Sequence, residues 1–131
     1  MPASPGTALD RARFVSLTTF RRSGEAVSAP VWIGQDGDAL IVLTPAETGK
    51  VKRLRNDPRV QLRPCSRTGR VAGGAACVAG TAEILDDEES RERLTAVIRR
   101  KYGLEYRVVM AVERLVKHGA ATRVILRITP S

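Results

Sequence analysis

Short blocks of apolar and β-branched residues recur along the chain, separated by turns that contain glycine, proline or aspartate. Blocks of this kind, typical of strands, cover residues 14–20, 26–33, 39–44, 60–65, 76–85 and 122–128. The block at residues 39–44 is apolar along most of its length and should be buried on both faces, whereas the last block alternates. The pattern predicts six strands.

The second block carries a constraint on its place in the sheet. Pro30 lies inside it, and proline cannot donate a hydrogen bond to a neighbouring strand. This strand is therefore expected at a sheet edge, at a bulge, or with Pro30 where no donor is needed. Residues 34–38, Gly-Gln-Asp-Gly-Asp, are expected to form the hairpin turn that follows.

Helical spacing of apolar residues occurs at residues 48–56, from about residue 86 to residue 102, and at residues 108–116. The first helix should end at Asp57-Pro58, because the residue before proline is pushed out of the helical region. Asp86 and Asp87 are candidate N-caps of the second helix. Its apolar stripe consists of Leu94, Val97, Ile98 and Tyr102. A short helical turn is also expected at residues 9–13.

The order of these elements predicts a mainly β protein: a six-stranded antiparallel split β-barrel with a few short peripheral helices. The 131 residues suffice for one core and are too few for two, so residues 1–131 should form a single domain. No apolar run is long enough to span a membrane, and residues 1–7 lack the features of a secretory signal. We expect a cytoplasmic protein with no membrane partner.

The net charge of +8 is concentrated in one part of the chain. The cations between residues 50 and 70 are Lys50, Lys52, Arg53, Arg55, Arg59, Arg63, Arg67 and Arg70. Asp57 alone opposes them, which indicates either an anionic partner (a phosphate, a polycarboxylate or a nucleic acid) or a solvated basic face. The segment has no aromatic residue on which bases could stack, so nucleic-acid binding is not expected.

Several kinds of site have weak support. His118 is the single histidine and stands beside a glycine in an apparent turn, so histidine-based catalysis is not expected. Cys65 and Cys77 match no zinc spacing and are expected to be reduced and buried, with a disulfide between them as the alternative. The sequence Thr48-Gly49-Lys50 is not a nucleoside-triphosphate loop, because the first glycine and the hydroxyl residue after lysine are missing. No metal site is predicted.

A phosphate site is predicted where the third strand meets the first helix. The strand ends near Thr44, and the helix begins about four residues later with unpaired backbone N–H groups. Lys50 and Lys52 stand in its first turn, where the helix dipole disfavours cations unless an anion is also present. Thr44 and Thr48 can add hydroxyl donors.

Four stretches of the chain resemble a known family. They are Leu17–Phe20 with Gly24, Ala29–Trp32, Thr44 through Thr48–Leu54 to Asp57–Val60, and Pro64-Cys65 through Gly69 to Gly80–Ala82. These stretches resemble the pyridoxamine-phosphate-oxidase-like split β-barrels, and in particular the actinobacterial class of F420-dependent oxidoreductases. The resemblance implies a homodimer that binds the deazaflavin coenzyme F420, or alternatively flavin mononucleotide (FMN), in a site shared between subunits.

The resemblance also implies a set of cofactor-binding residues. They are Ser28, Ala29, Pro30, Val31, Trp32, Leu43, Thr44, Thr48, Gly49, Lys50, Lys52 and Arg53. In this reading residues 28–32 face the ring, with core packing as the alternative role of Trp32. Thr44, Thr48, Lys50 and Lys52 hold the phosphate, and Arg53 either assists them or faces solvent. No catalytic residue is assigned.

Two departures from the family favour F420 over FMN. Members that bind FMN have an arginine where Ser28 stands and a glutamine near Ala75 or Ala76. The additional arginines of residues 55–70 would suit the glutamate tail of F420. The implied activity is hydride transfer between the cofactor and a small organic substrate, for which a tetrapyrrole such as biliverdin is one candidate. A protein that binds or carries the cofactor without turnover is the alternative.

Overall fold

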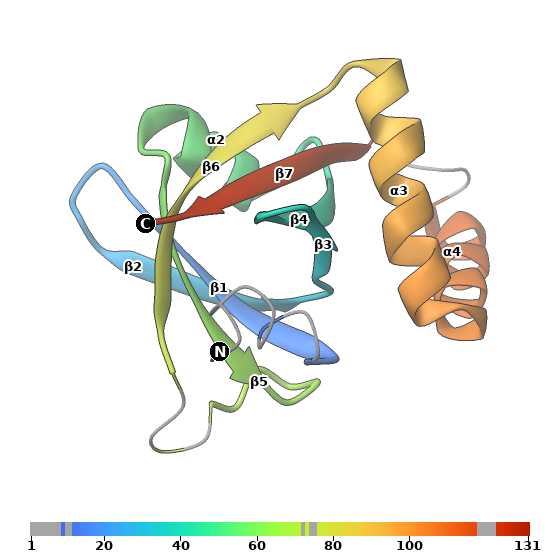
Figure 1. The fold of residues 1–131 in the computed structure, drawn as a ribbon, viewed down its shortest axis with the longest axis horizontal. Helices are drawn as coiled ribbons and strands as arrows, with labels where there is room; N and C mark the ends of the chain where they lie inside the picture. Colours follow the sequence, from blue (N-terminus) through green and yellow to red (C-terminus); the bar gives the residue numbers. More distant parts are fainter. Residues whose placement is uncertain (1–8, 10–11, 72, 74–75, 118–122) are drawn as a thin grey trace.

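A computed structural model gives the fold and describes residues 9, 12–71, 73, 76–117 and 123–131. Its strands are β1 (Phe14–Phe20), β2 (Ala26–Val31), β3 (Gly34–Asp36), β4 (Ala39–Pro45), β5 (Arg59–Cys65), β6 (Val78–Leu85) and β7 (Arg123–Pro130). Its helices are α2 (Gly49–Asn56), α3 (Glu88–Tyr102) and α4 (Leu104–Lys117). A strongly curved sheet forms the body of the molecule, with α3 and α4 side by side on one flank (Figure 1).

The described strands form one antiparallel sheet in the order β2-β1-β5-β6-β7-β4-β3. The two edge strands, β2 and β3, follow one another in the chain and are joined through Trp32 and Ile33. The sheet therefore curls back on itself at this connection, but the strand order contains no ladder between β2 and β3. The predicted mainly β antiparallel fold is confirmed, while the six-stranded barrel is corrected to an open sheet of seven strands.

The additional strand, β3, lies within the segment that was predicted to be a turn. Gly34 to Asp36 pair with Ala39 to Ile41 of β4, so the hairpin turn itself is limited to Gly37 and Asp38. Gly37 has a φ of +61°, a backbone conformation that residues with side chains rarely adopt. The predicted strand at residues 26–33 ends earlier, at Val31, because Trp32 and Ile33 form the corner between β2 and β3.

Two apolar cores hold the elements together. The larger fills the inside of the curved sheet with residues such as Leu17, Leu40 and Leu126, and Leu54 of α2 packs against it. The smaller lies between α3 and the outer face of β4 and β7, where Ile41 contacts the predicted stripe of α3. Strand β4 is therefore buried on both faces, as predicted.

Helix ends follow the predicted signals. Asp87 caps α3 by accepting a hydrogen bond from the Ser90 N–H at 2.9 Å, and α2 stops before Pro58. Helix α4 begins directly after Gly103 and leaves an apolar face exposed. The exposed residues of this face are Leu104, Val108, Val109, Val112 and Leu115. Within the part of the chain that the structure describes, no helix has the length and apolar character needed to cross a membrane.

The remaining local predictions have mixed outcomes. Strand β2 lies at a sheet edge, as Pro30 required. Both cysteines are free thiols, but the prediction that both are buried is wrong, because Cys65 is half-buried and Cys77 is exposed just before β6. Ala12 donates a backbone hydrogen bond to Leu9 at 2.9 Å, which is consistent with a turn there, although residues 10–11 lie outside the described residues. His118 also lies outside them.

Candidate functional site

The start of α2 presents polar groups to a possible ligand. Thr48 caps the helix: its hydroxyl accepts a hydrogen bond from the Val51 N–H at 3.5 Å and donates to the Pro45 carbonyl at 3.3 Å. Val51 and Leu54 are buried and fix which side of the helix faces the sheet. The first turn contains no acidic residue, so its backbone N–H groups and Lys50 form a positive helix start.

Arg53 folds back over this helix start. Its Nε donates a hydrogen bond of 2.6 Å to the buried hydroxyl of Thr19 on β1. A Cβ atom added at Gly49 would lie 2.7 Å from the Arg53 Nη1, so the glycine leaves room for the guanidinium beside the first turn. The sequence left open whether Arg53 faces solvent, and the structure shows it half-buried and held by β1.

Lys50 and Arg53 are neighbouring cations at the start of α2. Burial, and secondarily the charge of Arg53, lowers the pKa of Lys50 below its ordinary value. Neither cation forms an ion pair with a carboxylate of the described residues. A bound phosphate would offset both effects, because an opposite charge favours the protonated form of the lysine. The donor set at this helix start therefore fits a phosphate group.

Two other predicted phosphate ligands lie elsewhere. Lys52 is exposed and follows Lys50 by two residues, which places the two side chains on nearly opposite sides of the helix. Thr44 is 2% exposed and its hydroxyl is 3.5 Å from the Pro45 carbonyl, so it faces the interior of the sheet. The structure thus groups Thr48, Gly49 and Lys50 with Arg53 and separates them from Lys52 and Thr44.

Strand β2, predicted to face a ring, has one exposed face. Ser28 and Pro30 are exposed, while Ala29 and Val31 are half-buried on the other face of the strand. The Ser28 and Thr18 hydroxyls share a hydrogen bond of 2.7 Å. The loop after β5 packs against Pro30, since a Cβ atom at Gly69 would lie 3.4 Å from the proline Cδ.

Trp32 and Leu43 belong to the core beside α3 rather than to the start of α2. The Trp32 ring stacks on Tyr102 with centroids 4.6 Å apart. Its half-buried side chain also lines a cavity of about 590 Å³. The other residues that line this cavity are Phe14, Arg67, Leu104, Glu105, Val108 and Val109. Sequence reasoning missed this cavity, because nothing in the apolar pattern of α4 shows where the helix packs.

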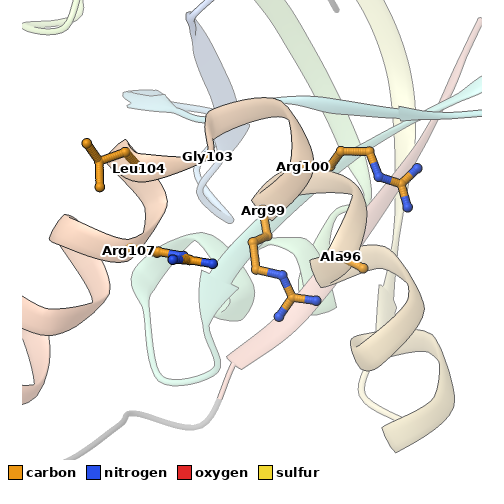
Figure 2. A pocket seen from close by; sticks show the side chains of 6 residues that line it. All are labelled: Ala96, Arg99, Arg100, Gly103, Leu104 and Arg107. Carbon is orange, nitrogen blue, oxygen red and sulfur yellow. The ribbon is translucent and has the colours of Figure 1, made fainter.

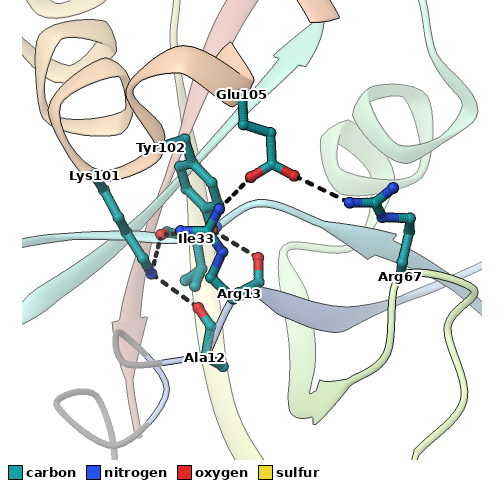
Figure 3. Close-up of polar contacts among 7 residues, drawn as sticks. All are labelled: Ala12, Arg13, Ile33, Arg67, Lys101, Tyr102 and Glu105. Atoms are coloured by element: carbon teal, nitrogen blue, oxygen red, sulfur yellow. Dashed lines mark hydrogen bonds and ion pairs between the residues drawn. The ribbon is translucent and has the colours of Figure 1, made fainter.

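Polar contacts hold α3 and α4 beside this cavity (Figure 3). The Tyr102 hydroxyl donates to the Arg13 carbonyl at 2.8 Å and accepts from the Ile33 N–H at 3.0 Å. Lys101 Nζ donates to the carbonyls of Ala12 and Ile33 at 3.0 and 2.7 Å. These bonds fix the corner between β2 and β3 against the end of α3.

Glu105 closes the same side of the cavity. It forms ion pairs with Arg13, just before β1, and with Arg67 in the loop after β5, the second at 3.5 Å. Both arginines are largely exposed, so these pairs position the loop more than they stabilise the fold. Arg67 also lies over the Phe14 ring at 5.7 Å.

The two parts of the site lie near opposite ends of β1. Arg53 contacts Thr19 near the end of the strand, and Phe14 lines the cavity at its beginning. Five residue steps of an extended strand span about 16 Å. Strand β2 runs alongside β1 over this distance, with Val27 opposite Thr19 and Val31 opposite Val15. An elongated ligand along β2 could therefore reach both parts.

The basic segment does not form one patch. Its arginines are distributed over α2, β5 and the following loop. Arg59 is bound to Asp57 at 2.7 Å, and the side-chain hydrogen bonds from Arg59 lower the pKa of that carboxyl. The charge available to a ligand is therefore smaller than the sequence indicates. Within the described part of the chain, no cluster of three or more histidine, cysteine or acidic side chains could hold a metal ion.

The overall fold is similar to several solved structures. An F420 reductase superposes with a TM-score of 0.66 at 19% identity over 100% of this chain and 96% of its own. A putative pyridoxamine 5'-phosphate oxidase from Listeria innocua gives 0.63 at 19% identity, covering 95% and 89%. A FAD-binding protein from Mesorhizobium loti gives 0.64 at 17% identity, covering 100% and 91%. At these identities the similarity shows the fold alone.

Sequence comparison identifies the family. None of the curated proteins matches the chain in sequence. The family model of pyridoxamine 5'-phosphate oxidase, in contrast, matches residues 6–131, which is nearly the whole chain. This chain is therefore a member of the pyridoxamine 5'-phosphate oxidase family.

Proposed function

We propose that the chain is an oxidoreductase that binds coenzyme F420, with FMN as the alternative cofactor, and exchanges a hydride with a small organic substrate. The observation that carries this proposal is the pair of cations at the start of α2, Lys50 and Arg53, which no carboxylate of the described residues meets in an ion pair. Family membership supports a cofactor of the flavin type, and the similarity to a structure called an F420 reductase supports F420 as that cofactor. When bound, such a cofactor supplies the hydride chemistry.

The residues of this chain bind and orient the cofactor. Lys50, Arg53 and the backbone N–H groups of the helix start that Thr48 caps would hold its phosphate, and the exposed face of β2 would carry the chain that leads from the phosphate toward the ring. The apolar cavity beside Trp32 would keep water from the reacting part of the complex. Its volume of about 590 Å³ lies in the range of small-molecule sites.

A homodimer is the second part of the proposal. The apolar face of α4 supports it, because Leu104 and Leu115 are 75% and 80% exposed. Exposed apolar faces of this kind mark protein–protein interfaces in soluble proteins. The same face borders the cavity beside Trp32, so a second copy packed on α4 would cover the cavity and complete its wall.

The decisive test compares two lysines of the same helix. We expect Lys50→Ala to weaken binding of F420 or FMN about tenfold, because a charge-assisted hydrogen bond to the phosphate is lost. Lys52→Ala serves as the control, since it removes the same charge from the opposite side of α2. The affinity of this variant for the cofactor should equal that of the wild type. Cofactor fluorescence during titration gives both affinities.

Riboflavin makes the test specific for the phosphate. It carries the ring of FMN without the phosphate, so Lys50→Ala should leave its binding unchanged. An equal loss of cofactor affinity in Lys50→Ala and Lys52→Ala would contradict the proposed site. Binding of F420 without oxidation of its reduced form by any acceptor tried, biliverdin included, would indicate a carrier instead of an enzyme.

A further inference from the structure

A second cluster of cations lies at the junction of α3 and α4, on elements that take no part in the α2 site. Arg99 and Arg100 belong to the last turn of α3, and Arg107 belongs to the beginning of α4. Together with Ala96, Gly103 and Leu104 they line a cavity of about 420 Å³. Figure 2 shows Arg99 and Arg107 extending from the two helices toward the same space.

A sharp backbone bend brings these arginines together. Gly103 ends α3 with a φ of +54°, and α4 begins at the next residue. The Gly103 N–H donates to the Arg99 carbonyl at 2.8 Å, and the Arg107 N–H donates to the Gly103 carbonyl at 3.3 Å. Because a residue with a side chain rarely adopts this conformation, the glycine makes the close approach of the two helix ends possible.

The arginines at this junction have no acidic partner within the part of the chain that the structure describes. None of the three arginines forms an ion pair with a carboxylate of the described residues. Glu105, the acidic residue in the first turn of α4, is bound to Arg13 and Arg67 beside the other cavity. No carboxylate of the described residues therefore forms an ion pair with the arginines of this cavity.

The stabilising effect of the helix dipoles explains the positions of some arginines in this cluster but not of all of them. Cations near the C-terminus of a helix are favoured by its dipole, which accounts for Arg99 and Arg100. Arg107, in contrast, stands near the N-terminus of α4, where the dipole disfavours a cation. The helix dipole therefore does not account for it.

We propose that this cavity binds a compact anion that carries at least two carboxylate or phosphate groups. Guanidinium groups bind such groups through two parallel hydrogen bonds, and here Arg99 and Arg107 reach the cavity from different helices. One acidic group for each arginine gives the minimum of two. The volume of about 420 Å³ suits a small ligand. This anion site is independent of the cofactor proposed for α2.

The test measures binding of tripolyphosphate and of citrate by calorimetry. We expect the double variant Arg99→Ala/Arg107→Ala to bind the preferred anion about tenfold more weakly for each arginine removed. The matched control is Arg21→Ala/Arg22→Ala, which removes the same charge from the exposed turn between β1 and β2. The control should retain wild-type affinity, Lys50→Ala reports any binding of the same anions at the start of α2, and circular dichroism should show that all variants are folded.

The outcomes separate the site from general attraction. Arg99→Lys/Arg107→Lys keeps the charge but loses the planar fork, so an affinity between those of the wild type and the alanine variant supports the proposal. A preference for tripolyphosphate or citrate then distinguishes a phosphate from a carboxylate ligand. The proposal would be overturned if the two double alanine variants lost the same affinity, or if only Lys50→Ala lost affinity. It would also be overturned if the wild type bound neither anion.

Discussion

At the scale of single residues, the structure separates side chains that look alike in the sequence. Lys50 and Lys52 are both cations in the first turn of α2, yet Lys50 is half-buried beside Arg53 and Lys52 is exposed. Thr44 and Thr48 are both candidate donors, yet Thr44 faces the interior.

The sequence predicted the helix start and its charge. The sequence could not predict which of the candidate phosphate-binding side chains lie together. That depends on the rotation of α2 about its axis, which the buried side chains of Val51 and Leu54 fix.

A binding role for Lys50 implies a cost in stability. Its lowered pKa means that the protonated form is less favourable in the folded than in the unfolded chain. This unfavourable contribution is fully present below the folded pKa and disappears as the pH rises through the ordinary value. We expect Lys50→Met to raise the urea midpoint of the cofactor-free protein at pH 7, with a smaller gain near pH 10.

The comparison with Lys52→Met tests this reasoning. That side chain is exposed, so its replacement should leave the midpoint nearly unchanged. A lower midpoint in Lys50→Met would show that the lysine stabilises the fold and would remove the argument that its charge awaits a ligand.

At the scale of elements, local signals were sufficient where an element has its own pattern. The cap at Asp87, the stripe from Leu94 to Tyr102 and the stop at Pro58 were all visible in the sequence, and the structure confirms them. Strand β3 was missed because it is three residues long and its residues, Gly34, Gln35 and Asp36, are typical of turns. It forms through pairing with β4, which is a tertiary effect. The strand order likewise depends on distant pairings that no local pattern specifies.

The cap of α3 gives a pH-dependent prediction. Hydrogen bonds from Ser90 lower the pKa of Asp87, so its contribution to stability is present above the ordinary aspartate value and is lost as the pH falls through the lowered pKa. Asp87→Ala should therefore lower the thermal midpoint at pH 7, and the difference from wild type should shrink toward pH 2. The neighbouring Asp86→Ala is the control. A difference independent of pH would contradict the capping role.

At the scale of the whole molecule, the exposed face of α4 remains to be covered. If a second copy covers it, Val108→Glu or Val112→Glu should shift the protein from dimer to monomer in sedimentation equilibrium, because a buried unpaired carboxylate is costly. Asn56→Glu, at an exposed position of α2, is the matched control, and this variant should remain a dimer. A monomeric wild type would contradict the shared site, while a dimer in all variants would place the interface elsewhere.

The connection between the two edge strands has a consequence for how the protein avoids aggregation. An open sheet exposes unpaired backbone groups along its edges, which can recruit strands from other molecules. Here one edge, β2, carries Pro30, which lacks a backbone donor, and the other edge, β3, is only three residues long. The same proline that marks β2 as an edge strand therefore also interrupts it as a template, and the sheet can stay open without inviting further strands.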